Sequence, residues 1–207
     1  KNEEDNIVDV VRNAKTCTDE VVIIDSGSTD RTVELAEQEG TKVAFRAWDG
    51  DFSAQRNFAL SQTEADWVLY VDADERITPA LGEAIRDIVQ HGSLDKQYSI
   101  KRKSVAFGVT FNHGVLNPDH VLRMFPRNTV TWVHKVHEHP ECPLPKETLP
   151  GYFEHYAYTD WHEWEEKLCL YTTIWAQDAY ARGKRTSLGA VFGHSLGGFF
   201  KMFVLRK

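Results

Sequence analysis

Carboxylates directly follow two short apolar runs of this sequence. Asp25 comes after residues 21–24 (VVII), and Asp72 and Asp74 come after residues 67–71 (WVLYV). In an open parallel sheet, ligands bind beyond the carboxyl ends of the strands, where these side chains would lie. Two carboxylates one residue apart suit a hard divalent cation that keeps several waters and holds substrate phosphates. The alternative is that Asp72 and Asp74 are only turn and cap residues that bind no ligand. A motif this short often occurs without a function.

Alternating strand and helix patterns must position these carboxylates. Short apolar runs predict strands at 21–24, 42–45 and 67–71. Helices are predicted from Asn2 as an N-cap, over 29–39, over 51–62 and from Thr78 with Pro79 in the first turn. This alternation over residues 1–92 predicts a parallel sheet that is covered by helices.

The pattern changes after Gly92. Residues 98–110 and 121–132 alternate as antiparallel strands do. Helical spacing returns from Asp160 to Gly183 and again over 187–205. The sequence therefore predicts three parts, at 1–92, 93–158 and 159–207.

Composition limits the class of protein. Of 207 residues, 42% are hydrophobic and 27% are charged, which is ordinary for a globular protein and unlike a disordered chain. No apolar run reaches the ~18 residues that a membrane-spanning helix needs. The net charge of −7 argues against a nucleic-acid partner. Three widely spaced cysteines suggest no disulfide framework and favour a reducing compartment.

Four motifs in a fixed order are more specific than any one of them. They are Asn2-Glu3-Glu4, residues 25–30 (DSGSTD), Arg56-Asn57 and Asp72-Ala73-Asp74. Together they resemble the family 2 glycosyltransferases, whose fold is GT-A, a mixed sheet flanked by helices. The resemblance continues more loosely through residues 136–138 and 183–185, a pattern similar to the bacterial enzymes that add glucose to the inner core of lipopolysaccharide. A GT-A domain begins with a strand before the Asn-Glu-Glu loop, so we expect an N-terminally truncated fragment with a C-terminal helical extension.

The resemblance implies a nucleotide-sugar site. It places Glu3 near the ribose, Asp25 at the uracil edge and Arg56 over the diphosphate, where a guanidinium fork fits phosphate oxygens. Asp72 would contact the ribose or the metal, and Asp74 would bind Mn²⁺ or Mg²⁺ across both phosphates. An exposed helix arginine is the alternative for Arg56.

Ser28 and Asp30 belong to the same implied donor site. Both lie where a loop meets the start of a predicted helix, so helix capping is the competing interpretation.

Transfer with inversion also needs a base for the acceptor hydroxyl. Glu138 is the candidate, because burial or neighbouring charges can tune a glutamate for this task. A strand-edge glutamate paired with Lys135 or with a histidine is the alternative. His137 is the second candidate base, or a third metal ligand. His155 and the Trp161/Trp164 pair would line an acceptor pocket, unless these rings are simply core.

The C-terminal segment is basic and aromatic. Residues 179–207 contain six Lys or Arg and no Asp or Glu. The predicted helix over 187–205 carries aromatic residues on one side, which suits an interfacial anchor to anionic lipids. A helix that covers the sheet or forms a dimer contact fits equally well. A G-x-S-x-G motif around Ser195 resembles that of serine hydrolases, but no acid or histidine follows the serine as that fold requires.

These observations lead to one principal hypothesis. The chain is expected to be a metal-dependent inverting hexosyltransferase that uses UDP-glucose, with a lipopolysaccharide core sugar or another glycan or lipid-linked acceptor. It would work in the cytoplasm, at the inner face of the cytoplasmic membrane. The alternative is a non-catalytic module that keeps the GT-A shell and binds a sugar nucleotide.

Overall fold

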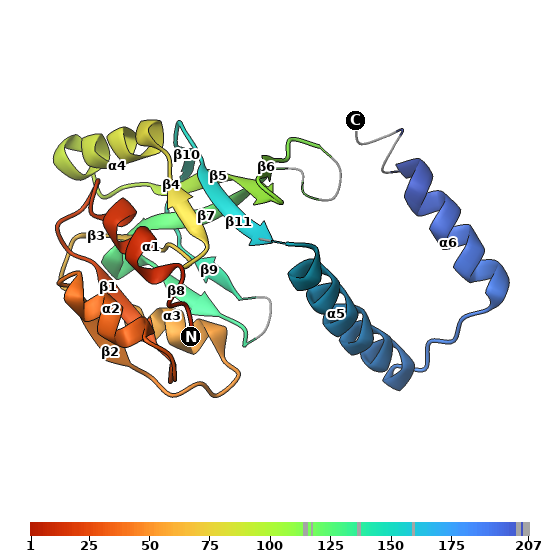
Figure 1. Ribbon diagram of the computed structural model, residues 1–207. Coiled ribbons are helices and arrows are strands. Elements are labelled where there is room, and N and C mark those ends of the chain that lie inside the picture. Colours follow the sequence, from red (N-terminus) through yellow and green to blue (C-terminus); the bar gives the residue numbers. More distant parts are fainter. Residues whose placement is uncertain (114–115, 117, 136–137, 159, 202–203, 205–207) are drawn as a thin grey trace. The chain divides into compact units, whose positions relative to one another are not determined.

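The computed structural model describes residues 1–113, 116, 118–135, 138–158, 160–201 and 204, except for the side chains at 163, 170, 171, 174 and 178. The chain forms two compact units (Figure 1). Unit 1 comprises Lys1–Arg102 and Asp119–His155, and unit 2 comprises Lys103–Pro118 and Tyr156–Lys207.

Helices and strands alternate in the first half of unit 1. The order there is α1 (Ile7–Ala14), β1 (Val22–Asp25), α2 (Thr32–Gln38), β2 (Lys42–Phe45), α3 (Phe52–Leu60), β3 (Trp67–Leu69), β4 (Glu75–Ile77) and α4 (Pro79–His91). The predicted elements are present, and α4 begins at Pro79 as expected.

Strands dominate the following segment. They are β5 (Gln97–Ala106), β6 (Val109–Thr110), β7 (Asp119–Pro126), β8 (Thr131–Val133), β9 (His139–Glu141), β10 (Lys146–Thr148) and β11 (Phe153–Tyr158), with a 3-10 turn at Arg127–Thr129. A mixed sheet has the strand order β3-β7-β5-β11-β4, with β6 and β10 pairing to β5. Two further pairs stand apart from this sheet, β1 with β2 in parallel and β8 with β9 in antiparallel.

The expected parallel sheet is only partly correct. β1 and β2 are parallel neighbours as predicted, with Val22 opposite Lys42. β3, however, pairs antiparallel with β7, with Val68 opposite Phe125. A short apolar run fits a partner of either direction, so the alternation of elements could not determine how β3 pairs.

The N-terminal helix also begins later than predicted. Asn2 is not its N-cap, because α1 starts at Ile7 and follows Asn6. Asn2 instead has a φ of 56° and ties two loops together. Its amide donates to Ser28 Oγ at 2.9 Å, and its Oδ1 accepts the Thr29 amide at 2.8 Å. Asparagine tolerates the left-handed region better than most residues, which suits it to this position.

Three apolar clusters hold unit 1 together. Ile7, Val10 and Val11 of α1 pack with Ala36 of α2 against β1 and β2. A second cluster joins α4 to the mixed sheet through residues such as Leu81, Ile100 and Phe153. The third cluster centres on Phe125, Val130 and Trp132, with Tyr70 packed against it. Val71, the next residue, packs against the first two clusters, so the segment between β3 and Asp72 is supported by all three.

Two asparagine side chains form the hydrogen bonds that a neighbouring strand would otherwise form with the backbone. Asn13 of α1 bonds both the amide and the carbonyl of Ile77 in β4, at 2.6 and 2.9 Å. Asn57 of α3 does the same for Trp132 in β8, at 2.9 and 2.8 Å. Each side-chain amide satisfies a buried backbone donor and acceptor as a neighbouring strand would.

Unit 2 contains the two C-terminal helices, α5 (Trp161–Ala181) and α6 (Leu188–Phe200). Gly183, with a φ of 80°, follows α5, and Ser187 caps α6 by accepting the Ala190 amide. Ser195 lies inside α6 and donates to the Val191 carbonyl, so it is no nucleophile elbow. None of the helices, over the residues the structure describes, is long and apolar enough to cross a membrane.

Gly151 lies close to the backbone of α4. Its φ is 83°, and a Cβ atom there would fall on the backbone of Leu81 in α4. We expect Gly151→Ala to destabilise the protein by about 1–2 kcal/mol through backbone strain and by about 1–3 kcal/mol more through overpacking. Urea denaturation of the purified variant measures the loss.

Gly50→Ala is the matched control. Gly50 has a φ of 79°, but no atom lies within 4 Å of its would-be Cβ. The control variant should therefore lose only the strain term. Equal losses for the two variants would contradict the close approach of Gly151 to α4.

Candidate functional site

The turn that follows β3 carries the carboxylate of Asp72 between two guanidinium groups. Arg123 Nη2 lies 2.5 Å from Asp72 Oδ2, and Arg56 Nη2 lies 3.2 Å from Asp72 Oδ1. Arg123 is buried on β7, whereas Asp72 keeps 38% of its side chain exposed. Asp72 is therefore partly exposed, and each of its two oxygens is paired with an arginine.

Glu75 ends the same turn and bonds the backbone of Asp72. Its Oε2 accepts the Asp72 amide at 3.0 Å, and the Asp72 carbonyl accepts the Glu75 amide at 2.9 Å. The Glu75 side chain is fully buried and pairs with Arg123 Nη2 at 3.1 Å and with Arg102 Nη1 at 3.4 Å. A buried carboxylate is tolerated only with such partners.

The two carboxylates that share Arg123 have pKa values shifted in opposite directions. Burial would raise the pKa of Asp72, but Arg123 and Arg56 outweigh it and hold that pKa below its usual value. Burial raises the pKa of Glu75, and this effect prevails over Arg123 while the charge of Asp72 adds to it. Asp72 is thus the carboxylate that stays ionised most readily.

Arg56 joins Asp72 to the candidate base. Its Nε lies 3.4 Å from Glu138 Oε1, and its guanidinium carbon stacks 4.6 Å from the centre of the Trp132 ring. Arg56 is therefore not an exposed helix arginine, and Glu138 pairs with Arg56 rather than with Lys135. His137 lies outside the described residues.

Asp74 points to a different partner. Its Oδ2 lies 3.2 Å from Nε2 of His155, which sits on β11 opposite Glu75. His155 therefore contacts Asp74. Its place in an acceptor pocket stays a prediction. A carboxylate and an imidazole are both ligands for divalent metals, and neither is bound to an arginine here.

No group of three or more metal-ligating side chains converges at one point among the residues described. A cation held by Asp74 and His155 would complete its shell with waters and phosphate oxygens, as Mg²⁺ and Mn²⁺ commonly do. The donor set fits such a cation. Asp72, with both oxygens on guanidinium groups, fits that role less well, and its assignment as a metal ligand stays a prediction.

The remaining predicted donor residues form a loop cluster near the N-terminus. Asp25 is buried and accepts the Gly27 amide at 2.8 Å and the Ser28 hydroxyl at 2.6 Å. Burial would raise the pKa of Asp25, but these hydrogen bonds outweigh it and lower that pKa. Asp25 therefore shapes the loop that follows β1.

Glu3 and Asp30 belong to the same cluster. The Glu3 amide donates to Thr32 Oγ1 at 2.7 Å, and the Glu3 carboxylate accepts the side-chain amide of Asn6 at 2.9 Å. Asp30 accepts the Thr32 hydroxyl at 2.6 Å and the Glu4 amide at 3.2 Å. These bonds order the loop, and the assignment of Glu3, Asp25, Ser28 and Asp30 to the donor stays a prediction.

The sequence analysis missed Arg123 and Arg102. The available signal for Arg123 was a single charge within the apolar run of residues 121–125 (VLRMF). A charge at such a position is buried only when it is paired, so it pointed to a carboxylate partner. Nothing in the sequence alone indicated which carboxylate.

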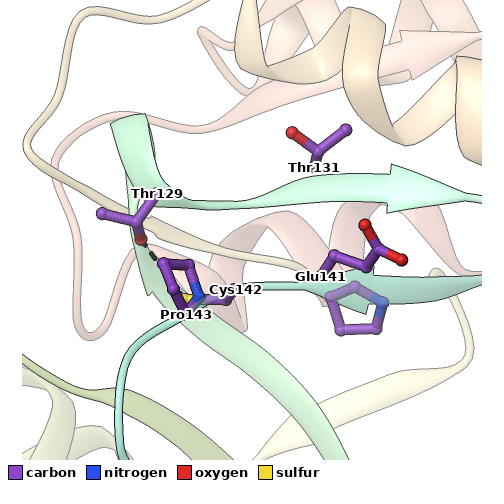
Figure 2. Close-up of a pocket in the computed structure, with 6 residues that line it drawn as sticks. Thr129, Thr131, Glu141, Cys142 and Pro143 are labelled. Atoms are coloured by element: carbon purple, nitrogen blue, oxygen red, sulfur yellow. Dashed lines mark hydrogen bonds between the residues drawn. The ribbon is translucent and has the colours of Figure 1, made fainter.

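A separate surface hollow lies beside the β8–β9 hairpin (Figure 2). It is lined by Thr129, Thr131, Pro140, Glu141, Cys142 and Pro143. Thr131 is exposed, whereas its neighbour Trp132 is buried beneath Arg56. Thr131 pairs with Glu141 and Pro140 pairs with Trp132, so residues from both faces of the hairpin contribute to the lining of the hollow.

Comparison with known proteins agrees with the motif order. Residues 1–134 match the family model described as glycosyl transferase family 2. An uncharacterized glycosyltransferase of Rickettsia typhi is 28% identical over 219 residues, which cover 100% of this chain and 75% of that protein. A lipopolysaccharide core biosynthesis glycosyltransferase, LpsC of Rhizobium meliloti, is 29% identical over 144 residues, or 66% of this chain and 53% of that protein.

One solved structure, titled as the crystal structure of a mycobacterial protein, superposes with a TM-score of 0.42. It shares 15% sequence identity, and the match covers 76% of this chain and 62% of that chain.

The loop after β1 gives a pH-dependent prediction. Asp25→Asn should lower the free energy of unfolding at neutral pH by about 1–3 kcal/mol, because the charged acceptor of these hydrogen bonds is lost. The folded-state pKa of Asp25 is lowered, so its stabilisation is present above about pH 4 and is lost as the pH falls through that lowered pKa. Urea denaturation from pH 7 down to pH 3 measures the loss of unfolding free energy at neutral pH and its change with pH.

The difference between Asp25→Asn and the unaltered protein should therefore shrink in acid. Asp19→Asn serves as the control, because Asp19 is exposed in the turn after α1. A constant difference at all pH values would contradict the role of the Asp25 charge.

Proposed function

The chain belongs to glycosyl transferase family 2 and is a glycosyltransferase, and on this premise we propose that it moves a hexose from UDP-glucose, with inversion, to a lipopolysaccharide core sugar or another glycan. Its mixed α/β arrangement agrees with the GT-A fold of that family. The observation that carries the proposal is the contact of Arg56 with both Asp72 and Glu138. It brings a candidate donor residue and a candidate base to one point.

The proposed reaction is a single displacement. The acceptor oxygen forms a bond to the anomeric carbon while the bond from that carbon to the diphosphate oxygen breaks. The diphosphate leaves with the electron pair, and the acceptor proton passes to Glu138. Arg56, whose guanidinium already lies between Asp72 and Glu138, would bind the diphosphate oxygens by charge-assisted hydrogen bonds.

Asp74 and His155 would hold a Mn²⁺ or Mg²⁺ ion, with Asp72 nearby. When bound, such an ion neutralises charge that develops on the leaving diphosphate. An imidazole ligand favours a transition metal, and this supports Mn²⁺ over Mg²⁺. Glu138 contacts Arg56 and takes no part in the Asp74–His155 pair. It would therefore not be used as a ligand of the ion and could act as the base.

The lipopolysaccharide acceptor is proposed from two observations. One is the similarity to the lipopolysaccharide core biosynthesis enzyme LpsC. The other is α6, in which Leu188, Phe192, Leu196 and Phe199 are all exposed. No charged residue occurs between Thr186 and Phe200, and Lys184, Arg185 and Lys201 flank the helix. An apolar helix between basic residues suits an anionic membrane surface, where a lipid-linked acceptor would lie on the cytoplasmic side.

Asp74→Ala tests the donor site. We expect calorimetric titration to show UDP binding that is stronger with Mn²⁺, and we expect the substitution to weaken the Mn²⁺-dependent part by at least ~10-fold, because a ligand of the ion is lost. Asp87→Ala is the matched control, since Asp87 also pairs with a histidine, His91, but on the exposed face of α4. UDP binding that does not depend on Mn²⁺, or an equal loss of affinity in both variants, would contradict the assignment of Asp74 as a metal ligand.

Glu138→Gln separates the base from the binding site. This variant should bind UDP with nearly unchanged affinity, while kcat for sugar transfer falls by about 10²–10⁴-fold. Transfer rates come from release of UDP in the presence of a glycan acceptor. Unchanged turnover would remove Glu138 from the mechanism and leave His137 as the candidate base.

Vesicle binding tests α6. Lys184→Ala/Lys201→Ala should weaken binding to vesicles that contain anionic lipid by about 2 kcal/mol, or on the order of 30-fold, because each basic residue near such a surface contributes about 1 kcal/mol. Sedimentation with phosphatidylglycerol and phosphatidylcholine vesicles measures the effect. Lys146→Ala, an exposed lysine of unit 1, is the control. Equal binding to neutral and anionic vesicles would refute the electrostatic part of the proposal.

A further inference from the structure

Arg123 holds the Asp72–Glu75 turn from inside the sheet. Its side chain is only 6% exposed, and its Nη2 reaches both carboxylates, at 2.5 Å from Asp72 and 3.1 Å from Glu75. Glu75 in turn accepts the Asp72 amide. Both the side chain and the backbone of Asp72 are thus oriented, directly or through Glu75, by this buried guanidinium.

The second partner of Asp72 has a different position. Arg56 contacts Asp72 at 3.2 Å and Glu138 at 3.4 Å, both of which are partly exposed. A diphosphate bound by Arg56 would compete with Asp72 and Glu138 for the same guanidinium. Arg123 is enclosed by the sheet and has no such competitor, so it keeps Asp72 in place.

Fold stability alone is a weak explanation for this arrangement. Replacing a buried ion pair by apolar residues is often neutral or stabilising, because desolvation offsets the attraction between the charges. Arg123 also makes its shorter contact with Asp72, the more exposed of its two carboxylates. The geometry therefore favours the control of Asp72 as the role of this residue.

We propose that Arg123 is a positioning residue, which fixes the Asp72 carboxylate in the orientation for the donor and so frees Arg56 for the diphosphate. This inference rests on the proposed function, because it assumes that Asp72 meets the donor. It assigns Arg123 no contact with the donor itself.

Arg123→Lys is the first test. Lysine keeps the charge but replaces the rigid planar guanidinium, whose Nη2 contacts both carboxylates, with an ammonium on a flexible chain. We expect the folded variant to bind UDP in the presence of Mn²⁺ on the order of 10-fold more weakly, as expected for a weakened charge-assisted hydrogen bond. Circular dichroism and the melting temperature confirm that the variant is folded.

Arg102→Lys is the matched control, because Arg102 also pairs with Glu75 but bonds Asp119 rather than Asp72. Its UDP affinity should stay within about twofold of the unaltered protein. A merely structural role through Glu75 would affect both variants alike, and that result would overturn the proposal. Wild-type affinity in folded Arg123→Lys would overturn it as well.

A second comparison applies if Arg123→Lys does not fold. Arg123→Gln/Glu75→Gln removes both charges of the buried pair, so neither is left unpaired. Glu75→Gln alone still offers an oxygen to the Asp72 amide. The double variant should bind UDP at least ~10-fold more weakly than Glu75→Gln, and equal affinities would refute the role of Arg123.

The unaltered protein separates the two proposals. If it binds UDP and the Arg123 variants bind equally well, only the role of Arg123 is wrong. If the unaltered protein does not bind UDP with Mn²⁺ present, the proposed function fails and the role of Arg123 fails with it.

Discussion

The burial of Glu75 constrains the rest of the site. A fully buried carboxylate requires cationic partners, and Arg123 and Arg102 supply them from β7 and β5. These partners lie on adjacent strands, so the charge of Glu75 links β4, a strand of the same sheet, and the turn before it to β7 and β5. Asp72 and Asp74 occupy that turn, and each takes its direction from its own partners, which are Arg123 and Arg56 for Asp72 and His155 for Asp74.

The consequence is a division between two carboxylates that look equivalent in the sequence. Asp72 lies on two guanidinium groups, which hold its pKa down against the effect of burial. Asp74, two residues on, lies beside His155 and bonds no arginine. A single turn therefore presents one carboxylate that lies between two arginines and one that faces an imidazole. This difference depends on partners from β7, α3 and β11, which lie far along the chain.

Much of the local structure could be predicted from the sequence, and the pairing of distant residues could not. The strand at 42–45 and the start of α4 at Pro79 follow from local patterns and proline geometry. The antiparallel partner of β3 does not, because an apolar run carries no information about direction. Motif order pointed to Arg56, Asp72 and Asp74 as donor-site candidates, and the need for a base pointed to Glu138. The structure brings Arg56, Asp72 and Glu138 into contact. Arg123 was missed because its meaning depends on a contact with a residue 51 positions away.

The motif Arg56-Asn57 shows why structure and chemistry are hard to separate in such a sequence. Successive residues of a helix point about 100° apart, so these two side chains of α3 face different neighbours. Asn57 bonds the backbone of Trp132 and anchors β8 to α3, while Arg56 stacks on the Trp132 ring and contacts Asp72 and Glu138. The asparagine thus places the ring on which the arginine rests. Arg56 can hold its position between two carboxylates because its neighbour in the chain fixes the surface beneath it.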